Sequence, residues 1–391
     1  MKKAGYSMLW VGLLIILSAC ANPVESTPQP VDNTPTLAPY SPDTPSPPKI
    51  DAPIVDSPSL TSIQFLNSTD GWGVTEMQIV RTNDGGITWY NVTPTDITET
   101  GFAIDLFVLD KDHAWMQVPD FENYPNSGFQ FQTEDGGMTW DSVSVPFSRG
   151  DIKFLDANNG WALADLGVGA GSNAVAVYQT TNGGVDWQET FINDPNNANA
   201  GNSLPLGGLK FGITPLNMTT AWVHGVIYAP GTAYLYRSDD AGHTWGQVSI
   251  SLPPGTENAD LTVEQLEFVT ATSAFFTMRI SSDTASLAIY VSDDGGDTWS
   301  LTQTPIPDGG TADFLSAEEI VVYNGSQFYV TRDAARTWNG IQPDVAFGET
   351  FATMDFVDAS TGWVITIDPT TNHRSLYKTG DGGITWFPVV P

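Results

Sequence analysis

A short box that ends in tryptophan recurs along the chain, and it constrains the fold more than any other feature. The sequence DDGGDTW occupies 293–299, and relatives such as RTNDGGITW and KTGDGGITW occur both before and after it. The tryptophans that end these boxes lie 39 to 58 residues apart. They are Trp89, Trp140, Trp187, Trp245, Trp299, Trp338 and Trp386. A repeat of this period indicates an array of similar structural units.

A second signature precedes each box, and its last residue lies 17 to 26 residues before the box tryptophan. FLNSTDGW ends at Trp72 and FVDASTGW at Trp363, with VLDKDHAW, FLDANNGW, PLNMTTAW, FVTATSAF and FLSAEEIV between them. The first unit divides into four short segments at 62–67, 71–75, 78–82 and 87–92. Residues 59–391 hold about 48 residues per unit, the length of a four-stranded propeller blade. We therefore predict an all-β fold, a seven-bladed β-propeller with four antiparallel strands in each blade.

We interpret the box as a structural turn between the third and fourth strands. Its glycine pair, Gly85 and Gly86 in the first unit, supplies the positive φ that a tight turn needs. The aspartate accepts hydrogen bonds from the amides of its own turn, and Thr88 adds a hydroxyl. The tryptophan opens the fourth strand, where we expect it to pack between blades. The aspartates given this structural role are Asp84, Asp135, Asp240, Asp294, Asp333 and Asp381.

The box resembles the Asp-box, or bacterial neuraminidase repeat, of sialidases and several glycoside hydrolases. The pairing of FVDASTGW with LYKTGDGGITW is similar to the photosystem II assembly and stability factor family, which implies a seven-bladed propeller. The resemblance covers 59–391 and is carried by the repeats alone. Departures from the pattern include the third box, which has Asn182 in place of aspartate, and the sixth, RDAARTW, which has no glycine. That family carries a basic patch for its membrane-protein client, whereas the bases of this sequence do not cluster.

The first nineteen residues have the form of a lipoprotein signal peptide. Lys2 and Lys3 precede an apolar run that is too short to span a bilayer convincingly. Leu17-Ser18-Ala19-Cys20 resembles the lipobox of bacterial lipoproteins, which implies that Cys20 is lipidated and begins the mature chain. We therefore expect an extracytoplasmic protein that is anchored to the bacterial cell membrane by lipid.

Three regions follow from these patterns: a signal peptide at 1–19, a linker at 20–58 and a propeller at 59–391. The linker is rich in proline, threonine and serine and lacks apolar periodicity, so we predict a disordered, extended tether. Cys20 is the single cysteine of the chain, and no internal disulfide is expected.

The net charge of −31 arises from 45 acidic against 14 basic side chains and makes nucleic acid an unsuitable partner, since phosphate backbones need basic groups. The four histidines are dispersed, and HExxH and paired-cysteine motifs are absent, so no metal site is predicted. Asp110-Lys111-Asp112 begins like a calcium loop without its later ligands. The glycine pairs belong to turns and not to helix starts, so no nucleotide cofactor is expected.

Variation in length is confined to one face of the predicted propeller. The links between first and second strands and the boxes are uniform, whereas the links on the opposite face vary, as at 118–130, 165–174, 191–209 and 251–263. Insertions confined to one face are typical of a binding face. Phe121, Tyr124 and Phe129 could stack on a sugar or dock a protein. The loop that follows offers Asn193, Asn196 and Asn197 to a glycan.

Two functions remain open, and the sequence favours the first. The first is a monomeric binding or assembly module that receives a protein or an envelope glycan on the variable face. The second is a cell-surface glycoside hydrolase that uses a carboxylate pair. Carboxylates on the expected face are Asp120, Glu122, Asp165, Asp194 and Asp260. Sialidase activity is disfavoured, because the Arg-Ile-Pro motif of that superfamily is absent and no arginine triad is evident.

Overall fold

The computed structural model describes residues 50–97, 105–303 and 305–390. The predicted signal peptide, Cys20 and most of the predicted linker lie outside the described residues. Residues 47–391 form one compact unit. In the described part the only helical segment is a 3-10 turn, η2 (Gly348–Thr350), so the all-β prediction is confirmed. No helix among these residues has the length and apolar character needed to cross a bilayer.

The described strands form six antiparallel sheets. The first sheet has the order β1-β5-β4-β3-β2, and the two after it have the orders β6-β7-β8-β9 and β10-β11-β12-β13. Their strands are β1 (Ile54–Val55), β2 (Leu60–Phe65), β3 (Gly71–Thr75), β4 (Ile79–Thr82), β5 (Trp89–Asn91), β6 (Asp105–Val108), β7 (Ala114–Pro119), β8 (Gly128–Thr133), β9 (Asp141–Val145), β10 (Gly150–Phe154), β11 (Gly160–Gly169), β12 (Ser172–Thr180) and β13 (Gln188–Ile192).

A nine-stranded sheet comes next, and two four-stranded sheets, β23-β24-β25-β26 and β27-β28-β29-β30, complete the chain. The strands of the nine-stranded sheet are β14 (Leu209–Pro215), β15 (Ala221–Val226), β16 (Tyr234–Ser238), β17 (Gly246–Gln247), β18 (Asp260–Phe268), β19 (Ala274–Ser281), β20 (Ala285–Ser292), β21 (Ser300–Leu301) and β22 (Ile306–Pro307). The last eight are β23 (Thr311–Phe314), β24 (Ile320–Tyr323), β25 (Phe328–Thr331), β26 (Asn339–Ile341), β27 (Phe351–Phe356), β28 (Gly362–Ile367), β29 (Arg374–Thr379) and β30 (Phe387–Pro388).

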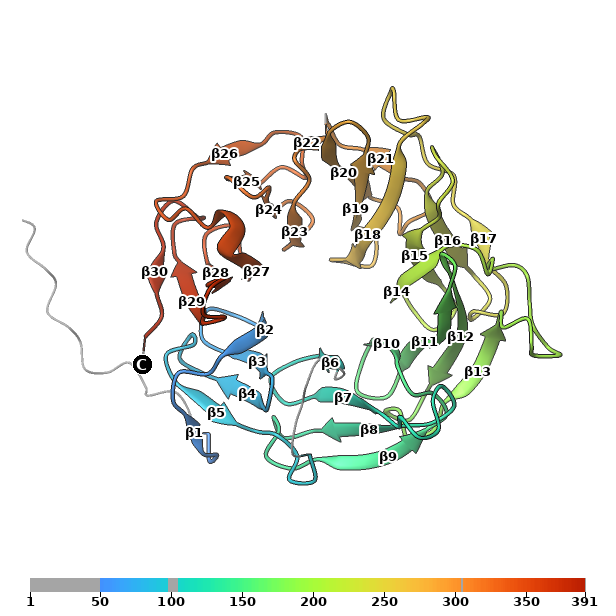
Figure 1. Ribbon diagram of the computed structural model, residues 1–391, viewed down its shortest axis with the longest axis horizontal. Coiled ribbons are helices and arrows are strands. Elements are labelled where there is room, and N and C mark those ends of the chain that lie inside the picture. Colours follow the sequence, from blue (N-terminus) through green and yellow to red (C-terminus); the bar gives the residue numbers. More distant parts are fainter. Residues whose placement is uncertain (1–49, 98–104, 304, 391) are drawn as a thin grey trace, which may run out of the picture. The chain divides into compact units, whose positions relative to one another are not determined.

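The sheets surround a common axis, with the first strand of each repeat innermost and the fourth at the rim (Figure 1). The core lies between successive sheets, where each buried cluster combines residues of two neighbouring repeats. The ring closes by packing of β2 against β27, and none of the described strands is exchanged between the first and last repeats.

The predicted start of the folded region at residue 59 is wrong. Ile54 and Val55, placed in the predicted linker, pair with Tyr90 and Trp89 as strand β1. Ile50 is buried as well. The physical reason is that β5 leaves an open sheet edge, and a short strand added there satisfies its backbone groups, as in the bond from the Asn91 amide to the Pro53 carbonyl at 2.7 Å.

The segment 165–174, predicted as an irregular link, is instead the end of a long hairpin. β11 and β12 pair from Gly160 with Thr180 out to Gly169 with Ser172, with a shift in register between Asp165 and Gly167. The turn residues Ala170 and Gly171 have φ of 50° and 76°. Two positive φ values match the tight turn whose twist suits a hairpin, and so the ladder continues beyond the body of the sheet.

Candidate functional site

The box is a hydrogen-bonded turn, as its sequence predicts. In the first box the Thr88 amide donates to Asp84 Oδ1 at 2.8 Å, and Gly85 and Gly86 have φ of 76° and 93°. In the second box the Thr139 hydroxyl donates to Asp135 Oδ2 at 2.7 Å. These bonds engage the carboxylates within the turn. In the fifth box they lower the pKa of Asp294 to about 2, the hydrogen bond from the Thr298 hydroxyl being the largest cause.

Sequence reasoning missed one member of this turn, the hydroxyl residue that ends the third strand. Thr82 donates from its hydroxyl to Asp84 Oδ1 at 2.9 Å and accepts from the Gly86 amide at 3.0 Å. The equivalent residues repeat both contacts and are Thr133, Thr180, Ser238, Ser292, Thr331 and Thr379. The signal was available, because serine or threonine stands two positions before the aspartate, or Asn182, of every box.

The box tryptophans pack against the repeat that precedes their own. Trp89 of the first repeat joins a cluster with Trp363 and Ile365 of the last, and Trp386 of the last joins Phe328 and Val330 of the sheet before it. The other five have the same placement: Trp140, Trp187, Trp245, Trp299 and Trp338.

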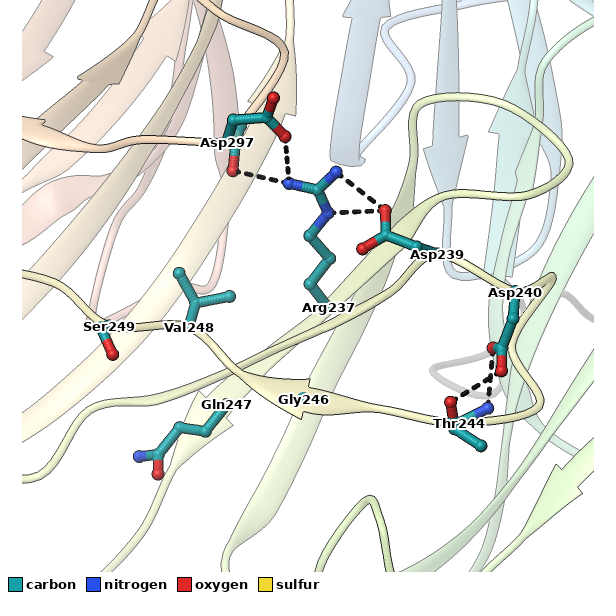
Figure 2. Close-up of a pocket in the computed structure, with 10 residues that line it drawn as sticks. Arg237, Asp239, Asp240, Thr244, Gly246, Gln247, Val248, Ser249 and Asp297 are labelled. Carbon is teal, nitrogen blue, oxygen red and sulfur yellow. Dashed lines mark hydrogen bonds and ion pairs between the residues drawn. The ribbon is translucent and has the colours of Figure 1, made fainter.

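A cavity of about 490 Å³ on the box face is lined by groups that are already paired. Figure 2 shows Arg237 of β16 between Asp239 at 2.8 Å and Asp297 of the next box at 2.6 Å. Arg237 also lies over the Trp222 ring at 5.0 Å. Asp240 accepts hydrogen bonds from the amide and the hydroxyl of Thr244 within its own box. These contacts bridge two repeats and engage the charged groups of this cavity.

The inner strands enclose a second cavity, of about 630 Å³, which we call the axial cavity. The second signature of each repeat is preceded by a residue on an inner strand. These residues are Gln64, Phe107, Lys153, Thr214, Glu267, Asp313 and Asp355. The first five line the cavity. Several members hold the next inner strand, since the Thr214 hydroxyl donates to the Leu266 carbonyl at 2.9 Å and the Gln64 amide to the Val108 carbonyl at 3.2 Å.

Carboxylates on three inner strands accept backbone amides of the following inner strand. Asp151 accepts from Ile213 at 2.8 Å, Asp313 accepts from Phe356 at 2.9 Å, and Asp355 accepts from Phe65 across the ring closure. Burial raises the pKa of Asp355 to about 7 and raises that of Asp313 well above its usual range. The charge of Glu267 adds to both shifts.

One base, Lys153, lines the axial cavity together with acidic and neutral groups. Lys153 pairs with Asp151 at 3.0 Å, and this carboxylate raises the lysine pKa. Glu267 is accessible from the cavity, yet the surrounding protein excludes bulk water and so raises its pKa. His224 is buried with Nδ1 3.1 Å from the Val263 carbonyl, and burial lowers its pKa, so it is neutral near pH 7.

A third cavity, of about 310 Å³, opens on the variable face; we call it the mouth cavity. It lies among β6, β10, β11, β12 and β14 and shares Asp151 and Phe211 with the axial cavity. Its charged lining residues are Asp105, Arg149, Asp151, Asp165 and Lys210. The bases of this region are dispersed in the sequence, and the fold brings Arg149, Lys153 and Lys210 to two adjoining cavities.

The predicted aromatic loop lies beside the mouth cavity. Phe121 and Tyr124 are 72% and 42% exposed. The loop is held to the segment that carries Arg149, because the Ser148 amide donates to the Pro125 carbonyl at 3.0 Å. Burial raises the pKa of Tyr124, and the charges of Asp165 and Arg149 act on it as well. Phe129 was expected on the loop but lies within β8, 45% exposed.

The predicted asparagines do not form a common site with this loop. Asn193 is only 4% exposed, and its side chain accepts from the Val175 amide at 2.7 Å and donates to the Leu204 carbonyl at 3.2 Å. The expectation that it contacts a glycan is corrected, because it connects two segments of the core. Asn196 and Asn197 are in a local turn, where Asn196 donates to Asp194 and Asn197 accepts from Asn199.

The carboxylates proposed for a hydrolase are also dispersed. Asp165 lines the mouth cavity, whereas Asp120 accepts from Asn123 at 2.7 Å and Asp194 accepts from Asn196, both within turns. In the described ranges no group of three or more His, Cys, Asp or Glu side chains is arranged to hold a metal ion. The acids that approach one another do so on the inner strands, which sequence reasoning did not select.

Comparison with known proteins identifies the repeat and the fold. The BNR/Asp-box repeat matches residues 290–301. A comparison with curated proteins finds no match to this sequence. A solved structure described as YCF48 bound to D1 peptide is similar to this chain, with a TM-score of 0.52, 15% identity, and coverage of 85% of this chain and 97% of that one.

Two carbohydrate-active enzymes have similar folds. One is the GH74 xyloglucanase from Xanthomonas campestris, with a TM-score of 0.56, 12% identity, and coverage of 86% of this chain and 55% of that one. The other is a polysaccharide lyase of family PL25, an ulvan lyase, with a TM-score of 0.50, 8% identity, and coverage of 85% and 97%. At such identities the similarity extends to the fold alone. The chain is a β-propeller, and residues 290–301 match the BNR/Asp-box repeat.

Proposed function

We propose that the chain is a membrane-anchored, extracytoplasmic propeller that binds a partner protein on its variable face. Lipidation of Cys20 would provide the anchor, and the proline-rich segment after it would hold the propeller away from the bilayer. An extracytoplasmic location agrees with the signal-like sequence at the start of the chain. The protein would act as a monomer, because each propeller presents a complete variable face.

The ring is proposed to have seven four-stranded blades. The nine-stranded sheet counts as two of them, since its halves are joined only by the pair Val226 and Thr262 of β15 and β18. Each half carries its own box, with Asp240 in one and Asp294 in the other. The extra strands β1 and β22 are edge additions outside the repeat.

One observation carries the binding proposal, namely that the exposed ring of Tyr124 lies beside a polar cavity on the variable face, with the exposed Phe121 on the same loop. Arginine and aromatic side chains around a cavity are typical of residues that dominate binding energy at protein interfaces. On the box face, in contrast, Arg237 already forms ion pairs with Asp239 and with Asp297 of the next repeat. The peptide in the similar YCF48 structure shows that a propeller of this kind can hold a protein segment.

Glycoside hydrolysis remains the second candidate because Asp313 and Asp355 have strongly raised pKa values, as general acids of glycosidases do. Both carboxylates, however, accept a hydrogen bond from a backbone amide of the next inner strand. This structural contact accounts for their burial without a catalytic role. Turnover of chromogenic glycosides that is lost in Asp313→Asn, with folding retained, would establish this alternative.

The binding proposal is tested by crosslinking and co-purification of the full chain from its native envelope. We expect one recurrent partner that is lost in the double variant Phe121→Ala/Tyr124→Ala. Phe387→Ala is the matched control, because Phe387 is similarly exposed but lies on the outer strand β30. Capture that is equal in wild type and the double variant, or a complete lack of a partner, would overturn the proposal.

A further inference from the structure

The charged groups of the mouth cavity differ in how far their bonding capacity is used. Lys210 donates to three carbonyls, those of Leu206 at 2.7 Å, Asn173 at 3.0 Å and Gly208 at 3.2 Å. Asp151 is engaged by the Ile213 amide and by Lys153. These two groups therefore have little capacity left for a ligand.

Three other groups remain available. No described side chain or carbonyl accepts a hydrogen bond from the guanidinium of Arg149, and no described donor contacts the Asp105 carboxylate. Asp165 uses one oxygen to accept from the Gly167 amide at 3.1 Å. Arg149 lines the cavity together with Asp105 and Asp165 and forms no ion pair with a described residue. Among the described residues, the cavity thus offers one unpaired cation and two carboxylates.

The size and apolar wall of the mouth cavity limit what fits it. Its volume of about 310 Å³ is at the lower end of the range for small-molecule sites. Leu163, Val175 and Phe211 form apolar parts of the wall, and Phe211 is 47% exposed. A compact ligand with charged groups at one end and an apolar side group satisfies both features.

A buried amide on the strand next to Asp105 points to a polar occupant near that residue. Gln117 is 2% exposed, and neither its nitrogen nor its oxygen has a hydrogen-bond partner among the described residues. Gln117 pairs in register with Asp105, so the two side chains share one face of their sheet. Buried polar groups are nearly always satisfied, so a bound polar group or water is expected there.

We infer that the mouth cavity binds the head group of an α-amino acid. Its carboxylate pairs with the planar guanidinium of Arg149, which can hold it through two parallel hydrogen bonds. Its ammonium group lies between Asp105 and Asp165, and its side chain contacts Phe211. The near balance of charge in the cavity favours this zwitterion over a simple anion, which the carboxylates would repel, and over a simple cation, which would leave Arg149 unpaired.

The inference is tested by calorimetric titration of the purified full chain with the common L-amino acids, their D forms and diaminopimelic acid. We expect at least one of them to bind, and its deaminated and decarboxylated analogues to bind about tenfold more weakly or worse, since each lacks one charge-assisted contact. A panel without a binder, or analogues that bind as well as the amino acid, would overturn the inference.

Variants locate the site. Arg149→Gln and Asp165→Asn should each weaken binding by about tenfold or more. Arg374→Gln is the matched control and should bind like wild type, because Arg374 also has no described hydrogen-bond or ion-pair partner but lines a different cavity. Equal affinity of Arg149→Gln and wild type would contradict the assignment. Near-ultraviolet circular dichroism confirms that each variant is folded.

The same head group occurs in free amino acids and at the end of peptide side chains on an envelope polymer. A muropeptide fragment that ends in diaminopimelate distinguishes the two sources, since tighter binding of the fragment indicates the polymer and equal or weaker binding indicates the free amino acid. This titration contains no partner protein. Its outcome is therefore separate from that of the partner capture that tests the proposed function.

Discussion

Trp363 of the last repeat stacks on Phe65 of the first, with ring centroids 3.6 Å apart and planes 3° from parallel. The Trp363 indole also donates to the Gly85 carbonyl at 3.0 Å. The same pair of contacts occurs inside the ring, where Trp115 stacks on Phe154 at 3.8 Å and donates to the Gly183 carbonyl at 2.9 Å. The ring therefore closes by repeating an ordinary junction between sheets.

Phe65→Ala should open this closing junction. Removal of a buried phenylalanine costs about 3–5 kcal/mol, and no covalent link between neighbouring repeats compensates for it here. We expect amide hydrogen exchange to become faster in β2 and β27. Phe154→Ala is the control, since it removes the equivalent ring from a junction whose sheets are joined by the chain. Unchanged exchange in β2 and β27 would show that the stack does not hold the ring closed.

The sequence predicts the parts of this fold that are local and repeated. Each box and each second signature carries its own turn residues, so strands such as 71–75 follow directly from the pattern. The start of the folded region was missed because Ile54 and Val55 form a strand only by adding to the edge of β5. A proline-rich composition gives no sign of that edge.

The axial and mouth cavities could not be predicted by the same means. Gln64, Lys153 and Glu267 are far apart in the sequence, and only closure of the ring brings them to one cavity. The bases do not cluster in the sequence, and the relation of Arg149 to Asp105 and Lys210 depends on three different sheets. The repeats do mark one relevant position, the residue just before each second signature, which lies on an inner strand in every repeat.

Trp386→Ala should lower the free energy of unfolding by about 3–5 kcal/mol. Trp386 is 3% exposed, stacks on Phe328 at 5.3 Å and donates to the Gly383 carbonyl at 3.0 Å, so its removal leaves a cavity and an unpaired carbonyl. Denaturant unfolding measures the change. Ile384→Ala, at an exposed position of the same box, serves as the control and should shift the midpoint little. An unchanged midpoint for Trp386→Ala would refute the structural role of the box tryptophans.

Ala334→Gly should stabilise the protein by about 1 kcal/mol, because a left-handed residue with a side chain is strained and glycine removes that strain. Ala334 and Ala335 have φ of 55° and 61°, in the place of the two glycines that most of the other boxes carry. Ala335→Gly is the comparison and should gain less, since Ala335 is fully buried and its methyl group would be lost. Thermal unfolding distinguishes the two, and a destabilised Ala334→Gly variant would contradict the strain argument.

Stability should fall as the pH rises from about 4 to about 7. Burial raises the pKa of Asp355 to about 7, so the folded chain keeps a proton that the unfolded chain releases near its ordinary value of 3.8. A raised carboxyl pKa therefore stabilises the fold at low pH, and this contribution is lost as the pH rises through 7. Asp313 acts in the same direction. Below pH 4 stability should instead fall as the pH falls, because hydrogen bonds lower the pKa of Asp294 to about 2 in the folded chain and its protonation disrupts them.

Asp355→Asn should weaken the decline between pH 5 and pH 8, as measured by the urea midpoint at each pH. An asparagine oxygen can still accept the Phe65 amide, so the ring junction is retained while the titrating proton is removed. Asp283→Asn, which changes an exposed carboxylate, should keep the slope of the wild type. If wild type and Asp355→Asn show the same slope, the inner carboxylate does not couple its protonation to ring closure, and the decline has another origin.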